Sequence, residues 1–398
     1  MKCSGRISRY LMLLLVGAFL APAWGGETWI LLQECPNGKL YRVGQQRVMV
    51  LEGRPYEIGK AHGQLLAKDA RALIQRILQF CMLSDLVREK NPTAGSLAKA
   101  YERLRPFIPE RYQQEMKGLA DGAGIPLRHV QLANVFPELF HCSGFALFGK
   151  ATKDGRLLHG RILDYLSYLG IQCHAVTMVI RPTGRNAFVN VGYAGFIGSI
   201  TGMNEKKIAI GQMGGRGAGQ WDGEPMAFLF RRAMEDADTL KEAVNVFRRA
   251  KRTCEYYYVI SDGKIPDARG LYCSPEKCLV LAPGETHEPE LPDAVADGVV
   301  FSRPSGLKVL LKWIRAGYGR FTPAKALRLM DRPVAMSSNL QNVLFAPETL
   351  EMWVAQAIRA GSPNFQACHQ PYQYYNFTRL LRHRGKTKEV KNAFVENN

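Results

Sequence analysis

The most informative residue for chemistry is Cys142, which begins a stretch whose pattern differs from the sequence before it. The stretch CSGFALFG predicts a β-strand with the cysteine at its first position. If the bond between His141 and Cys142 is cut, the α-amino group of Cys142 is freed. Its ordinary pKa of about 7.7–8.0 makes it a base at neutral pH, unlike a lysine at about 10.4. Thiol and base then share one residue, which is an activated nucleophile. The alternative is a cysteine that is only buried in a strand.

The segment before this cysteine predicts mainly helices. Residues 27–50 predict one or two short strands. Apolar residues at steps of three and four then predict a helix from Pro55 to about Cys81. More helix is expected between Ser96 and Leu119, interrupted by prolines.

The segment after Cys142 predicts mainly strands. Lys153–Gly155 is typical of a tight turn, and RLLHGRILDY predicts the returning strand. Further strands are expected at CHAVTMVIR, NAFVNVGY, GSITGM, KIAIGQ, EYYYVISD and around Cys273–Leu281, and NVLFAPETLEMWV predicts a late hairpin. Helices are expected to begin near Pro225, Thr239, Leu307 and Thr322. This order predicts an α+β fold, a four-layer αββα sandwich of two mainly antiparallel sheets with an N-terminal helical segment.

The N-terminus has the three parts of a secretory signal peptide. It contains a basic start, an apolar stretch from Leu11 to Leu20 and an Ala-x-Ala cleavage site at Ala21–Ala23. The apolar run is shorter than the roughly 17 residues that span a bilayer, and an uncleaved anchor is the alternative. No other segment is long and apolar enough to cross a membrane, so we expect a secreted or periplasmic protein.

These boundaries predict three parts of the chain. Residues 1–23 are the signal peptide, and residues 24–141 are the N-terminal helical segment, which self-cleavage would make the small chain. Residues 142–398 are the catalytic segment with a basic C-terminal tail.

The composition is that of a globular protein with an excess of positive charge. Apolar residues make up 46% and charged residues 22% of the 398 residues, and 53 Lys and Arg against 35 Asp and Glu give a net charge of +18. The obvious basic cluster, Arg379–Lys391, has no zinc-finger spacing, no aromatic RNA-binding motif and no basic heptads. We therefore expect no nucleic-acid partner, while a loose attraction to anionic surfaces stays open.

Other catalytic chemistries find little support in the sequence. The histidines show no metal-binding spacing, and the glycine-rich loop MGGRGAGQWDGE lacks the dinucleotide-binding pattern, so we expect no metal and no cofactor. The stretch GFIGSITG lacks the spacing of a serine nucleophile. A papain-like site could pair Cys142 with His287, but its local cysteine signature is absent.

Several segments, taken in order, resemble a known family. LEGRPYEIGKAHGQLLAKD, GLADGAGIPLRHVQLANVFPEL, HCSGFALFGKATKDGRLLHGRILDY, TGMNEKKIAIG and FTPAKALRLMDRP are similar to the acyl-coenzyme A:6-aminopenicillanic acid acyltransferase-like family (peptidase family C45). This family belongs to the N-terminal-nucleophile hydrolases, in which the catalytic residue opens a sheet strand after self-cleavage. The resemblance covers nearly all of the expected mature chain.

The resemblance implies roles for individual residues. Cys142 matches the nucleophile, and Arg161 and Asp164 match an Arg-x-x-Asp motif that surrounds it. The carboxylate can hold or orient the amine, and the arginine can keep the carboxylate ionised. Three-residue spacing places Arg161 and Asp164 on opposite faces of an ideal strand, so both reach the site only if the strand ends or bulges, for instance after Gly160. The alternative for the pair is a simple salt bridge.

The chain departs from the family pattern at two positions. The residue before the nucleophile is often Gly in the family and is His141 here, at the expected cleavage site. The family frequently has an Asn oxyanion donor where this chain has Tyr257, and loss of one such donor typically costs about 2.7–4 kcal/mol. Either the Tyr257 hydroxyl or a backbone N–H replaces that donor, or the activity is altered or absent. Arg303 is a candidate for a substrate-side arginine.

Two functions follow from the resemblance. The first is a self-processing cysteine hydrolase or acyltransferase that acts on an amide or thioester bond of an acylated small molecule or peptide. The second is a non-catalytic relative that binds acylated ligands or a cell-envelope partner, which Tyr257 favours. The sequence leaves the acyl group, the amine partner and the oligomeric state open.

Overall fold

The computed structural model describes residues 28–87, 94–136, 141–215, 219–288 and 293–382. The expected signal peptide and most of the basic tail lie outside these ranges.

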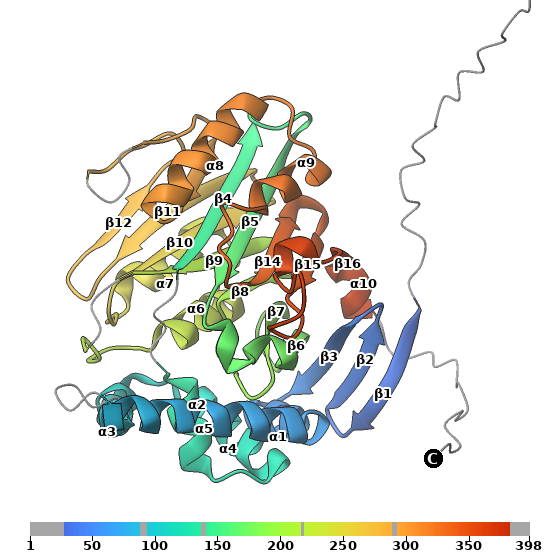
Figure 1. Cartoon of the computed structure of the whole chain (residues 1–398), viewed down its shortest axis with the longest axis vertical. Coiled ribbons are helices and arrows are strands. Elements are labelled where there is room, and N and C mark those ends of the chain that lie inside the picture. The colour runs from blue at the N-terminus through green and yellow to red at the C-terminus, as the bar shows by residue number, and fades with distance from the viewer. Residues whose placement is uncertain (1–27, 88–93, 137–140, 216–218, 289–292, 383–398) are drawn as a thin grey trace, which may run out of the picture.

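In the described part, the strands form two sheets (Figure 1). The ten-stranded sheet has the order β1 (Trp29–Cys35), β2 (Gly38–Val43), β3 (Gln46–Gly53), β6 (Ala175–Pro182), β7 (Phe188–Tyr193), β8 (Thr201–Asn204), β9 (Ile208–Gly214), β10 (Tyr256–Asp262), β11 (Asp267–Cys273) and β12 (Cys278–Leu281). The six-stranded sheet has the order β13 (Gly298–Phe301), β4 (His141–Gly149), β5 (Gly155–Asp164), β14 (Asn339–Ala346), β15 (Glu351–Gln356) and β16 (Gln373–Asn376).

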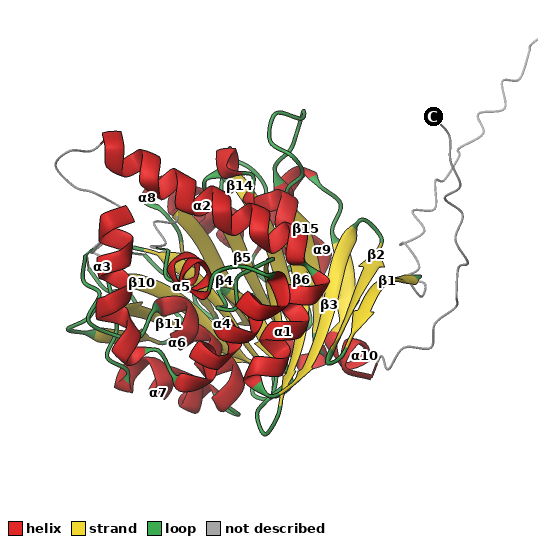
Figure 2. Cartoon of the chain, turned by 90° about the horizontal axis from the view of Figure 1, so that it is seen from below, coloured by secondary structure: helices red, strands yellow, loops and turns green. Residues whose placement is uncertain are grey.

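Helices cover the outer face of each sheet, as Figure 2 shows for the N-terminal ones. The helices are α1 (Pro55–Leu65), α2 (Ala67–Val87), α3 (Ala94–Leu104), α4 (Glu110–Ala123), α5 (Leu127–Asn134), α6 (Met226–Asp236), α7 (Leu240–Arg249), α8 (Pro304–Gly317), α9 (Pro323–Leu327) and α10 (Phe377–Arg382). Side chains of α1 to α7 share a core with the ten-stranded sheet, whereas α8 and α9 pack on the six-stranded sheet. A valine-rich core joins the two sheets. The expected four-layer α+β sandwich is confirmed.

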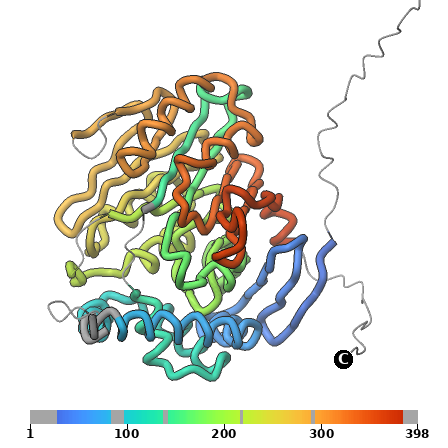
Figure 3. Tube along the Cα trace, viewed as in Figure 1, coloured from blue at the N-terminus to red at the C-terminus, as the bar shows by residue number. Residues whose placement is uncertain are grey.

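The N-terminal segment contributes more strand than the sequence predicts. It contains three strands, β1 to β3, where one or two were expected. The turn between β1 and β2 is made by Pro36 and Asn37, and Asn37 has a φ of +66°, in the left-handed region that asparagine tolerates. Strand β3 then pairs in parallel with β6, so both parts of the chain share one sheet. The trace in Figure 3 shows the N-terminal segment (blue to teal) along one side of the later one.

Most of the other expected elements are present, with a few additions. The hairpins β4–β5 and β14–β15 are confirmed, as is the capping box of α7, in which the Thr239 side chain accepts from the Glu242 N–H. The short elements β13, β16 and α10 were not predicted. Strands β13 and β16 have only four residues each. An alternation of apolar and polar side chains cannot be recognised over so short a stretch.

Two helices of the N-terminal segment, α1 and α4, cross at very short distance because glycines face each other. A Cβ atom added at Gly59 would lie 2.0 Å from the carbonyl oxygen of Glu115, and one at Gly118 would lie 2.1 Å from that of Tyr56. Only glycine fits at such contacts. The crossing places α4, and with it Glu115, against the later segment.

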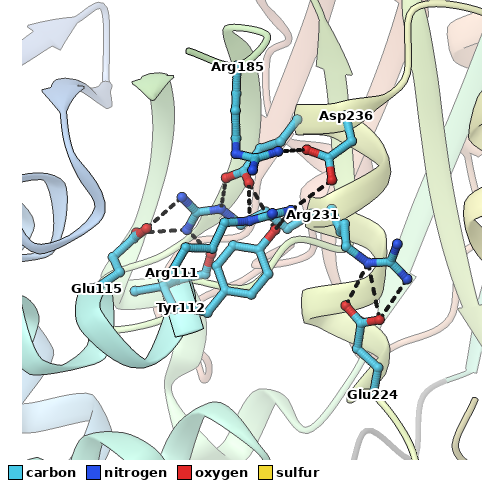
Figure 4. Close-up of polar contacts among 10 residues, drawn as sticks. Arg111, Tyr112, Glu115, Arg185, Glu224, Arg231 and Asp236 are labelled. Atoms are coloured by element: carbon cyan, nitrogen blue, oxygen red, sulfur yellow. Dashed lines mark hydrogen bonds and ion pairs between the residues drawn. The ribbon is translucent and has the colours of Figure 1, made fainter. Parts of the chain in front are cut away.

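A buried network of charges joins α4 to α6 across the expected cleavage boundary (Figure 4). The Arg231 side chain is 1% exposed and donates to both carboxylate oxygens of Glu115 at 2.7 Å. It also donates to Glu235 at 2.8 Å, and Glu235 accepts from the Tyr112 hydroxyl at 3.0 Å. Arg111 pairs with Glu235 as well, at 3.0 Å. The network therefore holds residues 28–136 to the catalytic segment without a covalent bond.

Removing the centre of this network is expected to be costly. Arg231→Met leaves the Glu115 carboxylate buried without its partner and Glu235 with only Arg111 and Tyr112, so we expect a loss of about 3–5 kcal/mol in the free energy of unfolding. Chemical denaturation followed by circular dichroism measures it. The matched control is Arg328→Met, which removes an arginine that is 83% exposed and paired with Asp331, for a change under about 1 kcal/mol. Equal effects of the two variants would contradict the assignment.

Candidate active site

The site is built on the first two strands after the expected cleavage point. Cys142 is the second residue of β4 and is 5% exposed. It pairs with Leu163 of β5, and Gly144 pairs with Arg161, so the side chains of Cys142 and Arg161 lie on the same face of the sheet. This face is the one that packs against the ten-stranded sheet, because Gly144 faces Met213 of β9.

The guanidinium of Arg161 lies beside the thiol. Its Nη2 lies 3.5 Å from the Cys142 Sγ, and its Nε and Nη2 donate to the Gln212 carbonyl at 3.2 and 3.1 Å. The arginine is fully buried, and Gly211 provides the space for it, because a Cβ there would lie 2.9 Å from the Arg161 Cγ. A cation is therefore fixed beside the sulphur by backbone and packing.

The surroundings of the thiol have opposite effects on its pKa. Burial raises the pKa of Cys142, and the Arg161 guanidinium lowers it. The Asp164 carboxylate raises it again, while the backbone N–H groups of Asp164 and Gly214 lower it by hydrogen bonding. The balance leaves the pKa above its ordinary value, so the thiol in the intact chain needs a base to become a nucleophile.

Asp164 ends β5 and faces away from Arg161. Its carboxylate accepts from the Met336 N–H at 2.9 Å, and burial raises its pKa to about 6. The pairing of β4 with β5 is regular from His141–Asp164 to Leu147–Leu158, so there is no bulge after Gly160. The register shift lies instead in β14, between Asn339 and Gln341. Arg161 and Asp164 thus keep the opposite faces that their spacing predicts, and no direct salt bridge joins them.

Tyr257 and Arg303, the candidates for the oxyanion site and the substrate side, have different contacts from each other. The Tyr257 hydroxyl donates to Glu255 at 3.3 Å, and its ring packs on Tyr272 and Phe301. Arg303 precedes α8, donates to the Pro333 carbonyl at 3.0 Å and interacts electrostatically with Asp164. His141, in β4, pairs with Asp164 of β5. The side chain of His141 and residues 137–140 lie outside the described part.

Two residues near the thiol were not predicted from the sequence. The Gly214 N–H faces the Cys142 sulphur, and the Tyr193 side chain, at the end of β7, interacts electrostatically with both Cys142 and Arg161. The Tyr193 hydroxyl and the Arg161 Nη1 are buried and have no hydrogen-bond partner in the structure. No local motif marks either residue, because both reach the thiol from the other sheet.

A narrow pocket of about 30 Å³ lies between the N-terminal segment and the catalytic segment. Its lining is mostly apolar and comprises Leu104, Asn134, Val135, Phe136, Trp221, Pro225, Met226, Ala227, Thr253, Cys254 and Tyr256. Tyr256 pairs with Gly214, whose N–H faces the thiol, so one wall of the pocket adjoins the site. A larger cavity of about 300 Å³, around Gln46, Thr177 and Gln356, contains none of the candidate catalytic residues.

The described residues include no group of three or more His, Cys, Asp and Glu side chains that could hold a metal ion. Within the same residues, no helix has the length and apolar character needed to cross a membrane.

Comparison with known proteins shows what the chain is similar to. The family model described as "Acyl-coenzyme A:6-aminopenicillanic acid acyl-transferase" matches residues 151–266. Over these residues the chain is similar to that family. The match covers β5 to β10 and includes Arg161 and Asp164.

Curated proteins are similar to the chain over part of their length. Acid ceramidase of Mus musculus is 30% identical over 266 residues, which are 58% of this chain and 64% of that protein. Protein dcd1A of Dictyostelium discoideum is 26% identical over 265 residues, which are 58% of this chain and 60% of that protein. The chain therefore spans less than two thirds of these relatives. Among solved structures, a Caenorhabditis elegans N-acylethanolamine-hydrolyzing acid amidase ortholog is 14% identical, with a TM-score of 0.42 over 52% of this chain and 93% of that one.

The closeness of Arg161 to the thiol leads to a prediction about reactivity. Arg161→Gln removes the cation, so the pKa of Cys142 is expected to rise and its alkylation to shift to higher pH. Iodoacetamide labelling across a pH series, with peptide mass spectrometry of Cys142, measures this shift. The control is Arg303→Gln. Arg303 lowers the pKa of Asp164 by its charge, and its replacement leaves the Arg161 cation beside the thiol in place. An unchanged profile in Arg161→Gln would contradict the assigned role.

Proposed function

We propose that the chain is a cysteine N-terminal-nucleophile hydrolase that cleaves itself between His141 and Cys142. The mature protein then acts on the amide or thioester bond of an acylated small molecule or peptide through an acyl-enzyme on Cys142. The observation that carries this proposal is the buried Arg161 guanidinium, 3.5 Å from the thiol at the start of a sheet strand. A structural cysteine in a core strand needs no buried cation beside it.

Self-cleavage would supply the base that the thiol lacks. The Cys142 thiol attacks the His141 carbonyl, the peptide bond breaks as the acyl group moves to Sγ, and water hydrolyses this thioester to a His141 carboxylate and a free thiol. The freed α-amino group of Cys142, with an ordinary pKa of about 7.7–8.0, then takes the thiol proton. The guanidinium of Arg161 stabilises the thiolate, and the N–H groups of Asp164 and Gly214 donate to it. Asp164, one pairing position from Cys142, would orient the new ammonium group.

The acyl transfer then proceeds in two halves. The thiolate of Cys142 attacks the substrate carbonyl, and the ammonium group protonates the leaving amine as the amide bond breaks. The product of this half is a thioester between the acyl group and Sγ. Water, or an acceptor amine, attacks the thioester in the second half and regenerates the thiol. The first outcome is hydrolysis and the second is acyl transfer.

The apolar pocket supports an acylated substrate. Its wall is formed by Phe136 of the N-terminal segment together with Trp221, Met226 and Tyr256 of the catalytic segment. At about 30 Å³ the pocket has room for no more than the end of an acyl chain, so it supports the proposal only as an apolar surface beside the site. The names of the relatives, an acyl-transferase family and acid ceramidases, point to the same class of substrate. We propose further that the chain is exported by its N-terminal signal and acts outside the cytoplasm.

A non-catalytic relative that binds acylated ligands is the second candidate. Tyr257, at the position expected for an oxyanion donor, favours it, because its hydroxyl donates to Glu255. The two candidates differ in covalent chemistry, since a binding protein forms no acyl-enzyme.

Trapping the acyl-enzyme tests the proposal. We expect an acyl thioester donor to leave a labelled Cys142 in the purified protein, and amide substrates with apolar acyl chains to be hydrolysed. Cys142→Ala is expected to lose at least about a thousandfold in rate, because the nucleophile is gone. Peptide mass spectrometry and amine release are the measurements. Cys173→Ala, which removes an exposed free thiol, is the matched control and is expected to keep full activity. Bound ligand without label or turnover would support the binding protein instead.

A further inference from the structure

Two cysteines of the ten-stranded sheet lie in near-bonding contact. Cys273 ends β11 and Cys278 begins β12, and the two residues are direct partners across the antiparallel hairpin. Their sulphur atoms are 3.0 Å apart. A disulfide bond measures about 2.05 Å, and the Cα atoms it joins are typically about 4.4–6.8 Å apart, a range that includes opposed antiparallel partners at about 5.5 Å or less. The bond could therefore form with little movement of the backbone.

The turn between the two cysteines is fixed by its own hydrogen bonds. The Ser274 N–H donates to the Lys277 carbonyl at 2.8 Å, and the Lys277 N–H donates to the Ser274 hydroxyl at 3.2 Å. Arg252 donates to the Ser274 carbonyl at 2.8 Å, which ties the turn to the end of α7. The two sulphur atoms are thus held together before any bond exists.

The two thiols differ in access and in acidity. Cys273 is 2% exposed, whereas Cys278 is only half-buried. The hydrogen bond between the thiols lowers the pKa of Cys278 and raises that of Cys273, and the guanidinium of Arg252 favours the thiolate of each. Cys278 is the thiol that a partner can reach first.

We propose that Cys273 and Cys278 form a disulfide by exchange with an external disulfide. We propose further that this bond stabilises β11 and β12, which adjoin the strands beside the proposed nucleophile. The inference goes beyond the proposed function and does not depend on it. It accounts for two of the eight free cysteines of the described residues.

The exchange balances with one external disulfide, either of glutathione or of a protein oxidant. The Cys278 thiolate attacks one sulphur of that disulfide, forms a mixed disulfide and releases the first external thiol. Cys273 then loses its proton and attacks the Cys278 sulphur, which releases the second external thiol. Two protein thiols are oxidised, and one external disulfide is reduced to two thiols.

The position of the pair connects it to the site. Cys278 pairs with Cys273, Cys273 pairs with Tyr256, and Tyr256 pairs with Gly214, whose N–H faces the Cys142 sulphur. Strand β12 is the last strand of the ten-stranded sheet, so β11 alone holds it in the sheet. A covalent link at this edge limits the opening of β11 and β12 and so supports the strand that positions Gly214.

Peptide mapping of the full chain after incubation with glutathione disulfide tests the proposal directly. Trypsin cuts after Lys277, between the two cysteines. The oxidised protein is therefore expected to yield the peptide of residues 270–277 joined to the one beginning at Cys278, and reduction should separate them. Two free thiols at these positions after oxidation, or a link from either cysteine to another one, would overturn the proposal.

Thermal unfolding with and without reductant provides the second measurement. Closing this short loop is expected to raise the melting temperature of the oxidised protein by on the order of 3 °C. The difference should vanish in Cys278→Ser and persist in Cys368→Ser, a matched control at another half-buried cysteine. A difference that persists in Cys278→Ser would mean that reduction acts elsewhere, and the stabilising role would be wrong.

Discussion

The structure depends on one costly constraint, the burial of the Arg161 cation between the two sheets. Moving an unpaired guanidinium into a protein interior costs several kcal/mol, and no carboxylate of the described residues is in ion-pair contact with it. The Gln212 carbonyl and the Cys142 thiol are its polar neighbours. A thiolate at Cys142 would be the anion that this cation lacks. The cost of burial is therefore recovered when the nucleophile ionises, which links the stability of the inter-sheet core to the proposed chemistry.

The same constraint explains why the two segments of the chain must stay together. Arg161 is held by β9, and β9 belongs to a sheet whose other edge is built from β1 to β3 of the N-terminal segment. Cleavage before Cys142 would leave those strands attached by backbone pairing with β6 and by the ion network around Arg231. The close crossing of α1 and α4 positions Glu115 for that network. The charges at this interface thus help to keep together the sheet that contains β9, and β9 holds Arg161 at the site.

Local patterns in the sequence predict much of the fold and part of the site. The hairpin that carries Cys142, Arg161 and Asp164 follows from the period of two and its turn, and the spacing of Arg161 and Asp164 correctly predicts opposite faces. The parallel pairing of β3 with β6 was not predictable, because it joins residues more than a hundred positions apart. Gly214 and Tyr193 reach the thiol from the second sheet, which no local pattern shows. Tyr257 remains a prediction as an oxyanion donor, and its contacts with Glu255 and Phe301 are those of a packed side chain.

The central claim is that Cys142 becomes the first residue of a chain, with its own amino group as base. The most direct test is the intact mass of the purified protein, together with N-terminal sequencing, beside the Cys142→Ala variant. We expect the natural protein to consist of two fragments, one ending at His141 and the other beginning at Cys142. The variant is expected to remain one uncut chain. A natural protein that stays in one piece, or that is cut at another bond, would contradict the claim.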